Sequence, residues 1–258
     1  MSARTVGFIG GGRVASILIG GWARANALPG KVVVCDPNAE ALARLKAKHG
    51  AIETTEDGTT AAAQDVVFIA VHPPVIPQAL APVKSALKPG AIVVSLAPKV
   101  TIAKLSEMLG GFGRVARMIP NAASIVGRGY NPVAFGAVLD AADRDGLKKL
   151  FAPWGECPEV AEAHLETYAL LSGMGPTYFW PQICELKSLG ESFGLAPQAA
   201  LAAIDKMLWG AVAVMKDSGL TPDQVMDLIP VKPLADDVAA LTTAMRTKLT
   251  GLMEKIRP

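Results

Sequence analysis

Short apolar runs recur along the first 160 residues, and helical patterns of mixed polarity separate them. The runs are TVGFI at 5–9, KVVVC at 31–35, DVVFIAV at 65–71, AIVVSLA at 91–97 and GRVARMI at 113–119. They are rich in valine and isoleucine and too short for buried helices, as strands covered on both faces of a parallel sheet usually are. Alternating strand and helix predicts a Rossmann-type doubly wound α/β domain over residues 1–161.

From about residue 162 the strand pattern disappears and apolar residues recur every three or four positions. This spacing predicts an all-helical domain over residues 162–258. Two stripes carry the pattern: Leu201, Ile204, Leu208, Ala211 and Met215, and then Val238, Leu241, Met245, Leu249, Leu252 and Ile256.

The helical half is too small to bury all its apolar stripes by itself. Between the stripes, Gly219 ends one helix, and Thr221-Pro222-Asp223-Gln224 has the residues of a capping box with proline at the first helical position. We therefore expect the stripes to pack partly against a second copy, which gives a homodimer or a larger oligomer of dimers through the C-terminal helices.

Composition and charge exclude several classes of protein. Of the 258 residues, 51% are hydrophobic and 19% charged, which is typical of a folded, core-rich protein. The net charge of +2 is scattered, so nucleic acid is not an expected partner. We expect no membrane span, because no apolar run reaches the length of one, and we expect no signal peptide. Three cysteines without metal-ligand spacing predict no metal site and a reduced, cytoplasmic location.

The first predicted strand runs into a glycine-rich turn that opens a helix. Gly10, Gly11 and Gly12 are followed by Arg13, Val14 and Ala15, which is a G-x-G-x-x-A pattern. The first and last glycine permit a tight turn and close approach of a pyrophosphate, and the alanine permits close packing of helix on strand. The helix N-terminus then attracts the phosphates. A glycine-rich turn in another kind of α/β protein is the alternative.

Two further positions fit a dinucleotide site. Asp36 ends the second predicted strand, where an acidic residue binds the adenine ribose, and a 2′-phosphate would meet its like charge. We therefore expect NAD(P)H, with a preference for NADH, although Arg13 could still reach a phosphate. Val71 ends the third predicted strand and His72 follows it, at the sheet edge where ligands bind. His72 could contact the cofactor or donate a proton, or be a partly exposed residue of a proline-rich turn.

The stretch YALLSGMGPTYFW, residues 168–180, interrupts a helical pattern with two glycines and a proline. Glycine allows the backbone to approach a ligand closely, and Pro176 can start a new helix. One interpretation is an anion-accepting turn around Ser172, Gly173 and Gly175. The other is a plain joint between two helices.

Along nearly its whole length, the chain resembles the pyrroline-5-carboxylate reductase family. The similar stretches are VGFIGGGRVASILIGG, VFIAVHPPVI, VVSLAPKVTIAKL, RMIPNAASIVGRG and LLSGMGPTYFWPQICELKSLGESFGL. The resemblance implies a Rossmann domain, a helical domain that interleaves in a dimer, and reduction of a cyclic imine to proline with a nicotinamide cofactor. It also implies that Ala97, Asn121 and His72 border the nicotinamide, with Ser172 to Pro176 on the substrate side.

The sequence departs from the family pattern at several positions. His72 stands at a usual lysine, and Pro98 and Lys99 stand at an alanine and a glycine. The largest departure is the segment PVKPLADDVAAL, where Asp236 and Asp237 match the threonines of the family's S-P-G-G-T-T substrate loop. These carboxylates would repel a substrate carboxylate, or pair with a cationic iminium or amine, or simply cap the last helix.

Three hypotheses follow. The first is an NAD(P)H-dependent imine reductase that transfers hydride to a C=N carbon, in which the changed substrate loop makes pyrroline-5-carboxylate a poor substrate. The second is a reductase or dehydrogenase for a different substrate. The third is a nucleotide-binding dimer without proline-forming activity.

Overall fold

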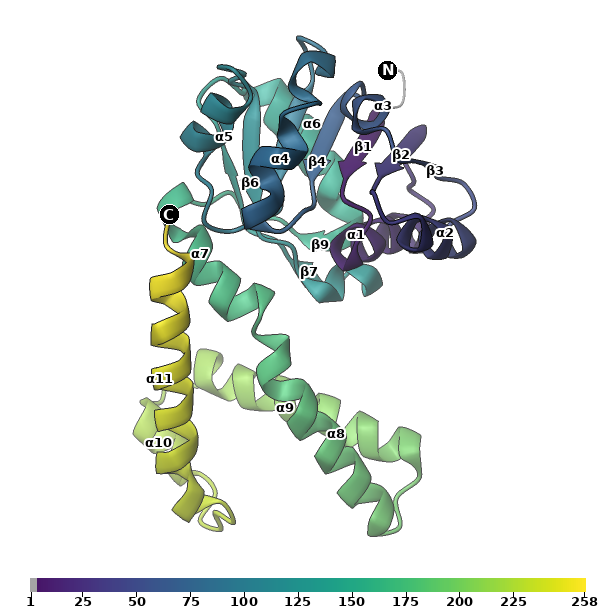
Figure 1. Ribbon diagram of the computed structural model, residues 1–258. Coiled ribbons are helices and arrows are strands. Elements are labelled where there is room, and N and C mark those ends of the chain that lie inside the picture. Colours follow the sequence, from purple (N-terminus) through teal and green to yellow (C-terminus); the bar gives the residue numbers. More distant parts are fainter. Residues whose placement is uncertain (1–3) are drawn as a thin grey trace. The chain divides into compact units, whose positions relative to one another are not determined.

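The computed structural model describes residues 4–258, which fall into two compact units (Figure 1). The first unit runs through Met174 and includes Met253–Pro258, and the second is Gly175–Leu252. The predicted domain boundary after residue 161 stays a prediction.

The first unit holds a seven-stranded sheet in the order β3-β2-β1-β4-β5-β6-β8. All pairs are parallel except β6 with β8. The five predicted strands are confirmed. Two have the predicted bounds, β1 (Thr5–Ile9) and β2 (Lys31–Cys35), and three are shorter, β4 (Val66–Ile69), β5 (Ile92–Ser95) and β6 (Val115–Met118). The sheet gains the edge strands β3 (Glu53–Thr55) and β8 (Val133–Phe135), and β7 (Gly129–Tyr130) pairs with β9 (Gly155–Glu156) in a second, two-stranded sheet.

Helices cover both faces of this sheet, as the predicted doubly wound fold requires (Figure 1). The core on one face includes α1 (Arg13–Arg24), α2 (Ala39–Lys48) and α6 (Ala141–Phe151). The core on the other includes α3 (Gly58–Ala62), α4 (Ile76–Leu80) and α5 (Ile102–Met108). Strand residues are buried on both faces, which explains why these strands read as continuous apolar runs rather than alternating ones.

Two tryptophans anchor the first of these cores. Trp22 on α1 and Trp154 are fully buried, with ring centroids 4.7 Å apart. Their indole N–H groups donate to the carbonyl oxygens of Leu150 and Leu18, each at 2.8 Å. These bonds satisfy the polar end of each ring inside the core and tie α1 to the end of α6.

The second unit is helical, with α8 (Pro176–Ser192), α9 (Pro197–Asp217), α10 (Pro222–Asp227) and most of α11 (Val238–Ile256). The capping box predicted at Thr221 and Gln224 is present, with both reciprocal bonds. Among the described residues of this unit, Ala200 and Ile204 are the only ones with a buried hydrophobic side chain. The helices therefore have very little interior within one chain.

Helix α9 corrects one sequence-based expectation. By length and composition it is a candidate membrane span, although we expected no apolar run of that length. This is weak evidence, because an apolar helix of a soluble protein passes the same test. Asp205 and Lys206 lie near the middle of α9, where charged side chains are costly in a bilayer. Nothing else indicates a membrane partner.

Candidate functional site

The glycine turn after β1 has the geometry that close approach of a ligand requires. Gly10 has φ +108°, and a Cβ there would lie 2.6 Å from the carbonyl oxygen of Ala70, so this position needs glycine. A Cβ on Gly12 would have no neighbouring heavy atom within 4 Å. Gly12 therefore faces open space, into which a ligand can come close to the backbone.

Helix α1 begins directly at this turn. Gly12 is its N-cap and no side chain caps the helix, while Ser16 makes the first intrahelical bond, to the Gly12 carbonyl at 3.1 Å. The backbone N–H groups of Arg13, Val14 and Ala15 lie in the first turn of the helix. They therefore have no helical carbonyl oxygen to which they can donate. Ala15 is fully buried and Arg13 exposed. The turn and these amides form a suitable site for phosphate.

Asp36 lies beside the glycine turn, because β2 pairs with β1 up to Cys35 opposite Ile9. Its Oδ2 accepts the Gly11 N–H and its Oδ1 accepts the Asn38 N–H, each at 2.8 Å. The carboxylate thus holds the turn in shape. Each oxygen keeps further acceptor capacity, which a ribose hydroxyl can use.

The other predicted cofactor residues follow the next strands of the same sheet edge. Val71 and His72 follow β4, Ala97 follows β5, and Asn121 follows β6. Because the strands are parallel, these loops all lie at the carboxyl edge of the sheet. The strand order reverses between β1 and β4, and the loops lie on the β4 side of that point. Ala97 and Asn121 are buried, whereas His72 is exposed and caps a short 3₁₀ turn without a side-chain bond.

Asn121 is held by a buried polar network. Its backbone N–H donates to Oδ1 of Asn131 at 2.8 Å, and the same oxygen accepts the Ser124 hydroxyl at 2.9 Å. The Asn121 side chain donates to the carbonyl oxygen of Ser172 at 2.6 Å. Asn121 therefore connects the loop after β6 to the segment that the sequence singled out at residues 168–180.

That segment does not stop the helix; it widens it. Helix α7 (Leu165–Tyr168) continues into a π-helical turn, Ala169–Gly173, and α8 begins at Pro176. Met174 N–H donates to the Ala169 carbonyl at 2.8 Å, five residues back. A Cβ on Gly173 would lie 3.1 Å from Cγ2 of Ile119, so this glycine permits close packing on the β6 loop. π turns occur frequently at functional sites.

Gly175, Asp236 and Asp237 belong to the helical unit. Gly175 is the N-cap of α8 and has helical dihedral angles. Asp236 and Asp237 lie in a 3₁₀ turn, Ala235–Asp237, that leads into α11, and both are exposed. The turn has no side-chain cap of its own.

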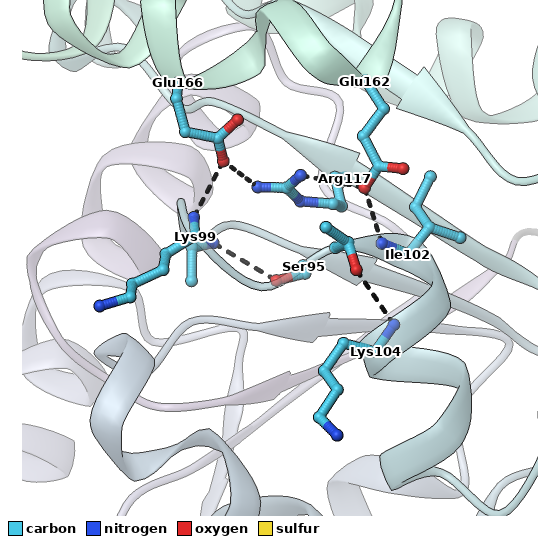
Figure 2. A network of polar contacts seen from close by, with 9 residues as sticks. Ser95, Lys99, Ile102, Lys104, Arg117, Glu162 and Glu166 are labelled. Carbon is cyan, nitrogen blue, oxygen red and sulfur yellow. Dashed lines mark hydrogen bonds and ion pairs between the residues drawn. The ribbon is translucent and has the colours of Figure 1, made fainter. Parts of the chain in front are cut away.

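Sequence reasoning missed a buried ion cluster beside this edge (Figure 2). Arg117 on β6 is 1% exposed and donates to Glu162 at 2.9 Å and to Glu166 at 2.5 Å. The same Glu166 oxygen accepts the backbone N–H of Lys99 at 2.9 Å, and Glu162 accepts the Ile102 N–H at 2.6 Å. The cluster ties the loop after β5 to α7, which runs directly into the π turn.

Comparisons with known proteins point to one family. The family model described as "NADP oxidoreductase coenzyme F420-dependent" matches residues 5–99. A pyrroline-5-carboxylate reductase of Pseudomonas aeruginosa is 30% identical, covering 99% of this chain and 93% of its own. Pyrroline-5-carboxylate reductase 2 of Pongo abelii is 32% identical, covering 86% of this chain and 71% of its own.

A solved structure extends the comparison to the fold. The crystal structure of Plasmodium falciparum pyrroline carboxylate reductase with NADP bound aligns with a TM-score of 0.78. The two are 22% identical, and the alignment covers 99% of this chain and 96% of that one. At this identity the likeness shows a shared fold.

Proposed function

The chain belongs to the pyrroline-5-carboxylate reductase family and is an NAD(P)-dependent oxidoreductase, and we propose that it reduces the C=N bond of a cyclic imine by hydride transfer. Its relatives carry that activity in their names. The protein's part in such a reaction is to position the imine against the nicotinamide and to stabilise the charge that changes during transfer.

One observation carries the proposal: the Asn121 side chain links the cofactor edge of the sheet to the π turn at 2.6 Å. In this proposal the turn from Gly10 to Ala15 binds the pyrophosphate. Val71, His72, Ala97 and Asn121 border the nicotinamide. The substrate residues are then Ser172, Gly173, Gly175, Asp236 and Asp237.

The preferred cofactor in this proposal is NADH. The Asp36 carboxylate beside Gly11 would repel a 2′-phosphate at the adenine ribose. Exposed Arg13 is the residue that would favour NADPH instead. The Plasmodium falciparum relative in its crystal structure has NADP bound, so the two proteins need not share a preference.

We further propose a cytoplasmic homodimer, or an oligomer of dimers, joined through the helices beyond residue 175. Large apolar side chains are exposed on every helix of that unit, for example Trp209 at 73% and Trp180 at 50%. An apolar surface of this extent is normally buried against another surface. In a homodimer, the same helices of a second copy would bury it.

Turnover with a panel of cyclic imines tests the proposed reaction. Oxidation of NADH or NADPH is followed at 340 nm with pyrroline-5-carboxylate, 1-pyrroline and their six-membered counterparts. We expect at least one imine to be reduced. If none is reduced while NADH still binds, the imine reductase proposal falls, and the hypotheses of a different substrate and of a binding dimer are the ones left.

A matched pair of glycine variants tests the cofactor site. Gly12→Val places a branched side chain in the open space at the turn, and we expect the loss of NADH binding in a fluorescence titration. Gly90→Val is the control, because Gly90 is equally open and its φ is also not in the left-handed region. NADH binding by Gly12→Val as tight as by Gly90→Val would refute the site.

A different substrate is the second candidate, and the exposed Asp236 and Asp237 favour it. Two carboxylates at the positions of the family's threonines oppose capture of a substrate carboxylate. If the unmodified protein turns over pyrroline-5-carboxylate with a kcat/KM of about 10⁴ M⁻¹s⁻¹ or more, an ordinary enzyme value, this candidate is excluded.

A further inference from the structure

Lys99 adopts a backbone conformation that lysine rarely takes. Among residues 4–258, only Asn26 and Lys99 are non-glycine residues with positive φ, at 52° and 77°. Asparagine visits the left-handed region readily, whereas for lysine the conformation is strained. Such strain persists only where the surroundings impose it, and it clusters at ligand-binding positions.

The buried ion cluster imposes this conformation. Glu166, with its side chain 4% exposed, accepts the Lys99 N–H and the Arg117 guanidinium on one oxygen. On the strand side, the Ala97 N–H donates to the Ser95 hydroxyl at 3.4 Å. On the helix side, Thr101 caps α5 by accepting the Lys104 N–H at 3.1 Å. The loop is fixed at both ends and in the middle.

The side chain of Lys99 is directed elsewhere. Figure 2 shows its amine pointing away from Arg117 and Glu166. Lys99 is exposed, and within residues 4–258 its ammonium makes no ion pair. The backbone N–H of Lys99 is thus bound by the cluster, while its ammonium group is available to a ligand.

The position of this charge indicates what it binds. Because β5 lies between β4 and β6, the Lys99 loop lies between the loop of His72 and the loop of Asn121. Lys99 follows Ala97 by two residues, on the edge where the nicotinamide is proposed to bind. An ammonium carried there by a loop with a fixed backbone can recognise an acidic group beside the reacting bond.

We propose that Lys99 is a substrate-binding residue, whose ammonium pairs with an anionic group of the imine and selects imines that carry one. This inference rests on the proposed function for the identity of the substrate. It assigns the recognition of the anionic group to the unit that contains the sheet. The strained backbone is the means by which the loop presents the ammonium outward.

Binding of simple carboxylates tests the assignment without turnover. The probes are cyclopentanecarboxylate and cyclopentanol, titrated calorimetrically into the protein–NADH complex. We expect the carboxylate to bind more tightly to the parent, and Lys99→Met to raise its Kd about ten- to hundredfold, as expected for a hydrogen bond to a charged group. The Kd of the alcohol should not change, and Lys99→Arg should retain most of the carboxylate affinity.

Lys84→Met is the control for loss of one surface charge. Lys84 is exposed and lies in a 3₁₀ turn, Lys84–Ala86, outside the loops that carry His72, Lys99 and Asn121. The proposal is overturned if Lys99→Met and Lys84→Met bind the carboxylate equally, or if the parent binds the carboxylate no more tightly than the alcohol.

Turnover separates this inference from the proposed function. With pyrroline-5-carboxylate and 1-pyrroline as substrates, Lys99→Met should lower the ratio of their kcat/KM values about tenfold or more, chiefly through KM for the acid. An unchanged ratio also overturns the role of Lys99. If no imine of the panel is reduced, the proposed imine reduction fails, and the carboxylate titration still decides on Lys99.

Discussion

Replacing Arg117 with methionine should destabilise the sheet-containing unit strongly. Methionine keeps an unbranched apolar stem but removes the guanidinium and the charge that Glu166 faces. Both partners are almost fully buried, at 1% and 4% exposure, so water cannot compensate Glu166. Breaking a buried pair by removing one partner typically costs about 3–5 kcal/mol.

The structure places this variant toward the lower end of that range. Glu166 keeps the Lys99 N–H at 2.9 Å after the substitution. Glu162, the other partner of Arg117, has a side chain 32% exposed, so it can rehydrate. For a unit of this size, a loss of about 3 kcal/mol lowers Tm by about 6–12 °C.

Thermal unfolding followed by circular dichroism measures the effect. Arg44→Met is the matched control: its ion pair with Glu40 is exposed, and such pairs contribute at most about 1 kcal/mol. Adding Glu166→Gln to Arg117→Met should restore part of the loss, because the buried charge is then absent. An Arg117→Met protein that unfolds within 1–2 °C of the Arg44→Met control would refute the reasoning.

Other predictions concern the cofactor, acid stability, the strained loop and assembly. The parent should bind NADH about tenfold or more tightly than NADPH, and Asp36→Asn should narrow that ratio; tighter NADPH binding by the parent would contradict it. The pKa of Asp65 is lowered to about 2, first by the hydrogen bond from Lys88 and then by that from the Thr5 N–H. The stabilisation of the folded state by ionised Asp65 should therefore be complete above about pH 4 and disappear toward about pH 2. The stability gap between parent and Asp65→Asn should close over that range, and a constant gap would count against it. Lys99→Gly should raise the stability by about 1 kcal/mol in urea unfolding, and a loss would show that the left-handed backbone carries no strain. Light scattering at micromolar concentration should give a dimer or larger species for the parent and a smaller species for Leu241→Asp, whereas a monomeric parent would remove the argument.

The central strands and the glycine turn could be predicted from sequence because their signals are local. The five predicted strands lie in mostly apolar runs, and the capping box at Thr221 is a four-residue pattern. Strand β3 could not be predicted in this way, since Glu53–Thr55 is short and polar at the sheet edge, and β8 is only three residues long. Both strands exist because a neighbouring strand offers its backbone groups, which no local pattern reveals.

The polar contacts around the candidate site are long-range and were not predictable from spacing. Arg117 and Glu166 are 49 residues apart, and Asn121 and Ser172 are 51 apart. One signal for the Lys99 loop was present in the sequence. Lysine there stands where the family has glycine, a residue that suits the left-handed conformation the structure shows.

The tryptophans give the two units separate optical signals. Trp22 and Trp154 lie in the dry core of the sheet, with centroids close enough for their indole transitions to couple. Trp180 and Trp209 are 50% and 73% exposed on the helical unit. Near-ultraviolet ellipticity should therefore report melting of the sheet core, while quenching of fluorescence by iodide should report whether the helical surface is covered. Dilution that separates subunits should raise iodide quenching before any near-ultraviolet signal is lost.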